Sequence, residues 1–215
     1  MSRRRRIVPP LAAVVAAATL AGCITGERPI LEETAAAAAT GDAAVDAVLS
    51  RLDVVGDQEF TATYDITNNF GPLTRTATVS QLGDGRRSVT IGDVRFLLGG
   101  STNVTCRLGG DGEQCSENID DAAISDLQVT HQFYARSAAD RLRTDAARRV
   151  GTTEGYASEI GGQPATCVAV PVSGGTKVWC ALDSGPLASY QGPDVVITLT
   201  SFAPAGDEAQ FSRTG

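Results

Sequence analysis

Apolar residues first recur at helical spacing shortly after residue 42, three or four positions apart, in DAAVDAVLSRLDVV. This spacing places them on one side of a helix and predicts a helix from about 43 to 55. The predicted apolar stripe consists of Val45, Val48, Leu49, Leu52 and Val55.

From residue 60 onward the period changes from 3.6 to 2, because apolar and polar residues alternate, as in FTATYDITNN. Alternation of this kind is typical of strands with one buried face, and Gly- and Pro-containing turns separate the segments. About ten short strands are expected, at 60–69, 73–81, 86–91, 94–98, 102–108, 156–160, 165–172, 177–183, 186–191 and 194–202.

Between about 121 and 149 the alternation stops, and two helical pieces are predicted. Asp120 and Asp121 suit the start of the first piece, since negative charge is favourable at a helix N-terminus. Ser137 with Asp140 three residues later indicates a capping arrangement at the start of the second. A long sheet with one apolar face must close or curl around a cover. The predicted fold class is therefore α+β, a strongly curved antiparallel sheet with about three helices on its concave side.

The N-terminal region has the pattern of a processing signal, with Arg3 to Arg6 followed by a short apolar run and LAGC. This order matches a bacterial lipobox and predicts that residues 1–22 are a lipoprotein signal peptide. Cys23 is then the first residue of the mature chain and carries acyl chains such as palmitate. The expected localisation is the extracytoplasmic face of the cell membrane. Export by the general secretory or the twin-arginine route is left open.

Residues 23–42 are small, polar and aperiodic, and are interpreted as a flexible tether with a reach of about 25 Å. The folded domain is expected at 43–215. Removal of residues 1–22 leaves 14 basic and 25 acidic residues, which changes the net charge from −7 to −11. This acidic balance argues against nucleic acid as a partner and favours a lipid anchor as the contact with the membrane.

Four further cysteines predict two disulfides, since the signal directs the chain to an oxidising compartment. Three pairings are possible, and the turns choose between them. A two-residue turn at Gly110-Asp111 places Cys106 opposite Cys115, and one at Ser173-Gly174 places Cys167 opposite Cys180. In both hairpins the cysteines fall at non-hydrogen-bonded positions, where facing side chains are closest. Trp179 is expected opposite Val168. No C-x-x-C pair occurs, so no metal site or cofactor is expected.

The order of these elements resembles the LolA-type lipoprotein carriers and the actinobacterial lipoproteins of the LppX and LprG kind. The resemblance rests on LAGC, the leading helix, EFTATYDIT, RRSVTIGDVRFLLGG, the inserted helices, EIGGQPATCVAVPV and KVWCALDSGPLASYQ. It implies a curved half-barrel whose concave side forms an apolar cavity, and in some members such a cavity holds lipid chains. No functional residue of the lipid carriers is matched individually.

The expected function is a membrane-anchored module that binds a lipid or another hydrophobic ligand, with a possible place in envelope lipid transport. The candidate lining residues, which could equally be ordinary core, are Phe60, Tyr64, Ile66, Val79, Ile91 and Phe96. The alternative is a sensor or accessory domain that binds a protein partner. An enzyme is not expected, because His131 is the one histidine and no G-x-S-x-G motif occurs. The glycine-rich SGGT is interpreted as a turn.

Overall fold

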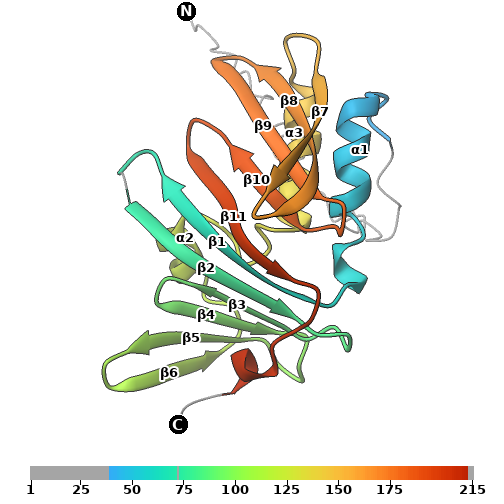
Figure 1. The fold of residues 1–215 in the computed structure, drawn as a ribbon. Helices are drawn as coiled ribbons and strands as arrows, with labels where there is room; N and C mark the ends of the chain where they lie inside the picture. Colours follow the sequence, from blue (N-terminus) through green and yellow to red (C-terminus); the bar gives the residue numbers. More distant parts are fainter. Residues whose placement is uncertain (1–38, 72, 213–215) are drawn as a thin grey trace, which may run out of the picture. The chain divides into compact units, whose positions relative to one another are not determined.

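Eleven antiparallel strands form a single sheet in the computed structural model, which describes residues 39–71 and 73–212 (Figure 1). The spatial order is β6-β5-β4-β3-β2-β1-β11-β10-β9-β8-β7, so two consecutive meanders are joined where β1 pairs with β11. The strands are β1 (Phe60–Asn68), β2 (Leu73–Gln81), β3 (Arg87–Ile91), β4 (Val94–Leu98), β5 (Val104–Gly109), β6 (Gly112–Glu117), β7 (Glu154–Ile160), β8 (Gln163–Val172), β9 (Gly175–Leu182), β10 (Leu187–Gln191) and β11 (Val195–Ala203).

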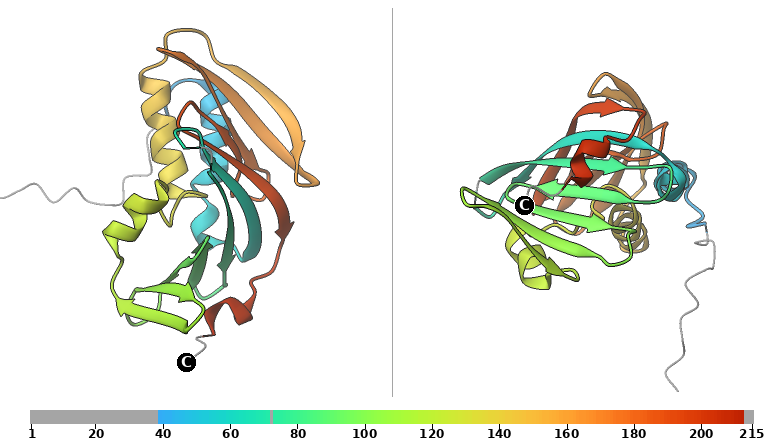
Figure 2. Two further views of the ribbon diagram at one scale, coloured as in Figure 1. Left: turned by 90° about the vertical axis from the view of Figure 1, so that its left-hand side faces the viewer. Right: turned by 90° about the horizontal axis from the view of Figure 1, so that it is seen from below.

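The sheet is curved and open, and its helices lie on the concave side (Figure 2), which confirms the α+β half-barrel predicted from the sequence. Its helices are α1 (Ala43–Leu52), α2 (Asp121–Leu127) and α3 (Arg136–Ala147), with short 3-10 turns η1 (Val55–Asp57) and η2 (Glu208–Phe211). Within the described part of the chain, no helix is long and apolar enough to cross a membrane.

The signal segment expected at 1–22, Cys23 and the tether as far as residue 38 lie outside the described residues. The described end of the expected tether is bonded to the domain. Thr40 donates from its backbone nitrogen and its hydroxyl to Asp46 Oδ1, each at 2.8 Å. Asp42 caps α1 by accepting from the backbone of Ala44 and Val45, and its second oxygen accepts from Thr153 Oγ1 at 2.7 Å.

The first predicted helix is confirmed in position and in its buried face. All five residues of its predicted stripe are buried, although α1 ends at Leu52 and the chain continues into η1 at Val55. Asp120 caps α2 as the acidic pair indicated, with its side chain accepting from Ala122 and Ala123.

The predicted cap of the second helical piece is wrong. Helix α3 begins at Arg136, its N-cap is Ala135, and no side chain bonds to that cap position. Ser137 instead shares a 2.7 Å hydrogen bond with Thr130 Oγ1, in the turns that precede the helix. The serine hydroxyl therefore ties the helix to its own loop rather than to its backbone.

The sheet has one strand more than the ten expected. The additional strand, β6, is GEQCSE, in which all residues are exposed except Glu113, whose side chain is buried against Arg95. Because Cys115 is its one apolar residue, alternation gave no signal for it, although the predicted hairpin with Cys106 opposite Cys115 required a strand here.

Both predicted disulfides are present, Cys106–Cys115 and Cys167–Cys180, each with a Cα–Cα separation of 4.0 Å. The predicted registers are confirmed, because Gly109 faces Gly112 in one hairpin and Val168 faces Trp179 in the other. Each disulfide therefore joins two adjacent strands of one hairpin.

Candidate functional site

The six candidate lining residues from the sequence all lie in the hydrophobic core, with side chains at most 4% exposed. They come from β1 to β4 and pack under the segment that joins α2 to α3. Tyr64 meets Phe133 edge to face at 5.1 Å, and Phe96 meets the His131 ring at 5.5 Å. Phe60 meets Tyr134 at 5.8 Å. None of the six borders either of the two recesses described next.

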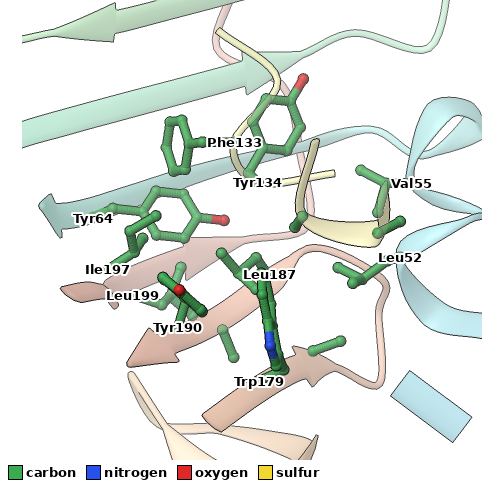
Figure 3. Close-up of a cluster of buried hydrophobic side chains, with 14 of the residues drawn as sticks. Leu52, Val55, Tyr64, Phe133, Tyr134, Trp179, Leu187, Tyr190, Ile197 and Leu199 are labelled. Atoms are coloured by element: carbon green, nitrogen blue, oxygen red, sulfur yellow. The ribbon is translucent and has the colours of Figure 1, made fainter. Parts of the chain in front are cut away.

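An apolar recess of about 90 Å³ lies deeper on the concave side, between the N-terminal half of α3 with its preceding turns and strands β9 to β11. Aromatic and aliphatic side chains form most of its wall, and Gln128, Thr130, Ser137 and Arg141 add polar groups. Figure 3 labels five of its apolar residues within the surrounding core: Phe133, Trp179, Leu187, Tyr190 and Ile197. Its apolar lining comprises Val129, Phe133, Ala138, Trp179, Leu187, Tyr190 and Ile197.

Trp179 is the largest buried side chain that borders this recess, 1% exposed and 4.2 Å from the Tyr190 ring between centroids. Its indole Nε1 is buried and makes no hydrogen bond. A buried donor without a partner costs about 1–3 kcal/mol, and such a group in a folded protein requires an explanation. Tyr64 Oη is a second such atom, but Tyr64 does not border the recess.

A polar cluster of Arg141, Tyr190 and Asp194 closes one side of the recess. Arg141 donates to Asp194 Oδ2 at 2.7 Å and to Tyr190 Oη at 3.1 Å, and its guanidinium lies 4.8 Å from the Tyr190 ring centre. Tyr190 Oη in turn donates to Asp194 Oδ1 at 3.2 Å. Gly192 lies so close to the Tyr190 hydroxyl that a β-carbon there would overlap it.

Burial raises the pKa of the Tyr190 hydroxyl, against the opposing effect of the Arg141 charge. For Asp194 burial also acts to raise the pKa, but the bond and charge of Arg141 outweigh it, and the pKa is lowered. The cluster is therefore a neutral phenol held between a guanidinium and an ionised carboxylate. Such a group fixes the position of Tyr190 over the recess.

Beyond this cluster lies a larger recess of about 720 Å³, at the C-terminal end of α3. It is bordered by the β8–β9 turn and the β10–β11 turn, both in the upper part of Figure 1. Asp145 and Lys177 form an ion pair in its wall, with Nζ and Oδ1 2.6 Å apart. The two recesses lie on successive turns of α3, since Arg141 borders the apolar one and Asp145 the larger one.

Sequence reasoning did not select Arg141, Leu187, Tyr190 or Ile197 for the site. The alternation in PLASYQ and DVVITLTSF did place Tyr190 and Ile197 on strands. Their orientation toward α3 depends on pairing of β9, β10 and β11, which the pattern did not give. Trp179 was expected in cross-strand packing, and that pairing is confirmed.

Two features bear on catalysis and metal binding. His131 Nδ1 is buried without a partner, and within the described residues no hydrogen bond joins its ring to a hydroxyl, thiol or carboxylate. Potential ligand atoms of Cys106, Glu113 and Cys115 lie within 4.8 Å of one another, but both sulfurs belong to the disulfide and Glu113 is paired with Arg95. Neither feature has the arrangement that nucleophilic catalysis or metal coordination needs.

The fold is thus an open half-barrel with helices in its concave side, and solved structures of similar fold are known. MucB is similar with a TM-score of 0.49 and 16% identity, over 81% of this chain and 64% of MucB. The MucA/MucB complex of Pseudomonas aeruginosa matches with a TM-score of 0.46 and 18% identity, over 80% of this chain and 61% of that one. LprF from Mycobacterium bovis matches with a TM-score of 0.40 and 13% identity, over 75% of this chain and 97% of LprF.

This chain therefore spans less than two thirds of the MucB chains that it matches. At these identities the likeness concerns the fold and transfers no ligand, partner or residue role. No protein-family model matches the chain. No curated protein matches it either.

Proposed function

We propose that this chain is a non-enzymatic binding module, anchored by lipid on Cys23 to the extracytoplasmic face of the cell membrane, whose ligand is a lipid or another hydrophobic molecule. The observation that supports it is the apolar recess of about 90 Å³, which is bordered by Trp179, a residue whose buried indole N–H has no hydrogen-bond partner. Apolar walls with a few placed polar groups are typical of ligand sites. A ligand that accepts a hydrogen bond would satisfy this donor.

The recess is smaller than the roughly 300 Å³ typical of small-molecule sites, so a ligand must enlarge it. The element most suited to move is the segment 128–135, which consists mainly of turns and covers the sheet with Phe133 and Tyr134. A backbone hydrogen bond of 2.8 Å from Leu187 to Tyr134 joins it to the sheet. Outward movement of this segment would join the recess to the space now filled by Phe133, next to Tyr64.

The test is mass spectrometry of the full chain, purified from bacterial membranes in a neutral detergent. Under denaturing conditions we expect a mass that begins at Cys23 and includes a diacylglycerol, and Cys23→Ser should lack both the cleavage and the lipid. Under native conditions we expect a further mass of several hundred daltons that organic extraction removes.

Trp179→Phe removes the indole donor and keeps an aromatic ring, so we expect a several-fold fall in the ligand-bound fraction. Tyr64→Phe is the matched control, because it removes an equally buried and unpaired donor that does not border the recess. A bare native mass, also after loading with envelope lipids, would overturn the lipid proposal.

A protein partner is the second candidate, and the free edge of β7 favours it. Six of the seven residues of β7 are exposed, including Tyr156, and its described pairing is with β8 alone. An exposed edge offers a row of unpaired backbone groups to an extended peptide. If native mass spectrometry shows the protein without a bound ligand, the favoured function is binding of a protein partner at the edge of β7.

A further inference from the structure

The larger recess at the end of α3 has the volume of a small-molecule site, about 720 Å³. It is separate from the apolar recess, because the cluster of Arg141, Tyr190 and Asp194 lies between their linings. The residues that border it are Asp145, Arg148, Val172, Ser173, Gly174, Gly175, Thr176, Lys177, Gln191, Gly192, Pro193 and Val196.

Arg148 supplies an unmatched positive charge to this recess. Its side chain is exposed, and its guanidinium has no acidic or hydrogen-bonding partner within residues 39–71 and 73–212. The neighbouring arginines differ, since Arg141 pairs with Asp194 and Arg149 lies 3.7 Å from Asp42 Oδ2. Together Arg148, Lys177 and Asp145 give the recess a net charge of +1 in a chain whose net charge is −7.

The Lys177–Asp145 pair is built into the wall rather than exposed on the surface. The two side chains are 19% and 9% exposed, so the ammonium is held in place by the carboxylate behind it. Asp145 Oδ2 is buried and accepts no hydrogen bond. A buried acceptor without a donor is costly, but this oxygen is closed to solvent and therefore faces protein rather than the recess.

The β8–β9 turn adds small donors next to Lys177. Ser173-Gly174 form the tip of the hairpin between Val172 and Gly175, and Gly174 has a φ of +97°. The same recess is bordered by Ser173, Gly174, Gly175 and Thr176. The SGGT stretch is a turn, as expected from the sequence, and the residue directly after it is Lys177.

We propose that this recess binds a phosphate ester. Arg148 and Lys177 contact the phosphate oxygens, and the turn donates further hydrogen bonds. Guanidinium and ammonium groups are the side chains that recognise phosphate. The three free oxygens of a phosphate ester can accept hydrogen bonds from both groups and from the turn. A soluble sugar phosphate and a phospholipid headgroup share this chemistry. The proposal does not depend on the apolar recess or on the lipid function.

The test is calorimetric titration of the full chain, in neutral detergent, with three probes: inorganic phosphate, glycerol 3-phosphate and micellar phosphatidylglycerol. We expect saturable binding that weakens with salt, as for any charge-dependent contact. Arg148→Ala should weaken it by about tenfold or more, the effect of a lost hydrogen bond to a charged group. Arg75→Ala is the matched control, since Arg75 has no acidic partner among the described residues and lies on β2 outside the recess.

The Lys177–Asp145 ion pair is tested with a double variant, because removal of Lys177 alone would leave Asp145 buried without a counter-charge. Lys177→Met combined with Asp145→Asn removes both charges, and its fold is checked by circular dichroism before titration. Binding of glycerol 3-phosphate that both variants weaken supports a soluble ligand. If phosphatidylglycerol is the one probe that binds, and both variants weaken its binding, the ligand is a phospholipid headgroup. No saturable binding of any probe, or binding that Arg148→Ala leaves unchanged, overturns the proposal.

Discussion

At the scale of single residues, the position of Tyr190 depends on close contacts as much as on charge. Arg141 and Asp194 hold its hydroxyl from two sides, and Gly192 leaves the space that this hydroxyl occupies. A β-carbon at Gly192 would overlap Tyr190 Oη and lie 2.9 Å from Asp194 Oδ1. The absence of a side chain at this turn is therefore a requirement of the site.

Gly192→Ala should destabilise the protein by about 1–3 kcal/mol, because the extra methyl group must displace a held ring. Chemical denaturation followed by Trp179 fluorescence measures the change, since Trp179 contacts Tyr190. Gly110→Ala is the control, because no atom lies within 4 Å of a β-carbon there. Equal stability of the two variants would contradict this account of Gly192.

The residue contacts that could be predicted from the sequence are those within hairpins. The partners of Cys106, Cys167 and Trp179 follow from counting outward from a turn, because strand pairing there is local. Arg141 and Asp194 meet although they are 53 residues apart, and neither lies in a motif. Their contact depends on the packing of α3 against β10 and β11, for which spacing carries no signal.

At the scale of elements, the two disulfide hairpins differ in exposure. Cys115 lies on the edge strand β6 and is exposed, whereas Cys167 and Cys180 are 0% and 3% exposed within the sheet. Both disulfides close short loops, with sequence separations of 9 and 13 residues. Loop-closure estimates give each about 2–3 kcal/mol of stabilisation.

Mild reduction should therefore open Cys106–Cys115 before Cys167–Cys180, because a reductant reaches an exposed sulfur first. Brief treatment with a phosphine, alkylation of the free thiols and peptide mass spectrometry give the order. Guanidinium-unfolded protein is the control, in which the preference should disappear. Earlier labelling of Cys167 and Cys180 in the folded protein would contradict the expected order.

The alternation pattern located every strand of the sheet except β6. Alternation located ten strands, including β1, β11 and the exposed edge strand β7, but not β6, because GEQCSE has one apolar residue and therefore no alternation. For α3, the Ser137 and Asp140 pattern gave a start two residues late, because Thr130 in the preceding loop binds the serine hydroxyl. Local capping signals compete with contacts made by the tertiary structure.

At the scale of the whole molecule, stability between pH 5 and 7 should depend on one side chain. His131 is the one histidine of the chain, and its ring lies against Phe96. Burial lowers the pKa of His131 from its ordinary value of 6.5, and the Arg87 charge lowers it further. The unfolded chain then binds the proton more readily than the folded chain does.

Because the pKa of the folded state is the lower one, the contribution of His131 is complete above pH 6.5 and decreases as the pH falls below it. Denaturant unfolding at pH 7, 6 and 5 should show this loss. His131→Phe keeps an aromatic ring against Phe96 and should remove the pH dependence in this window. If the free energy of unfolding of His131→Phe falls with pH as steeply as that of the unchanged protein, other groups cause the loss.

The curved open sheet with helices on its concave side was predictable as a whole, because a long apolar face requires a cover. The volume left under that cover was not predictable. It depends on how deeply Phe133 and Tyr134 enter the concave side, and both lie in a segment without periodicity. The six residues chosen from the alternation therefore identify the concave face and not the recess in it.

The seam between β1 and β11 also determines when the fold can be completed. Each half of the sheet is a run of neighbouring strands, but Thr61 pairs with Ala203 across almost the entire domain. Synthesis proceeds from the N-terminus, so β1 has no second neighbour until the residues of β11 have emerged from the ribosome. Local hairpins form quickly, and contacts between distant segments raise the contact order and slow folding. The two halves of the sheet therefore remain unjoined until the last strand of the chain is available.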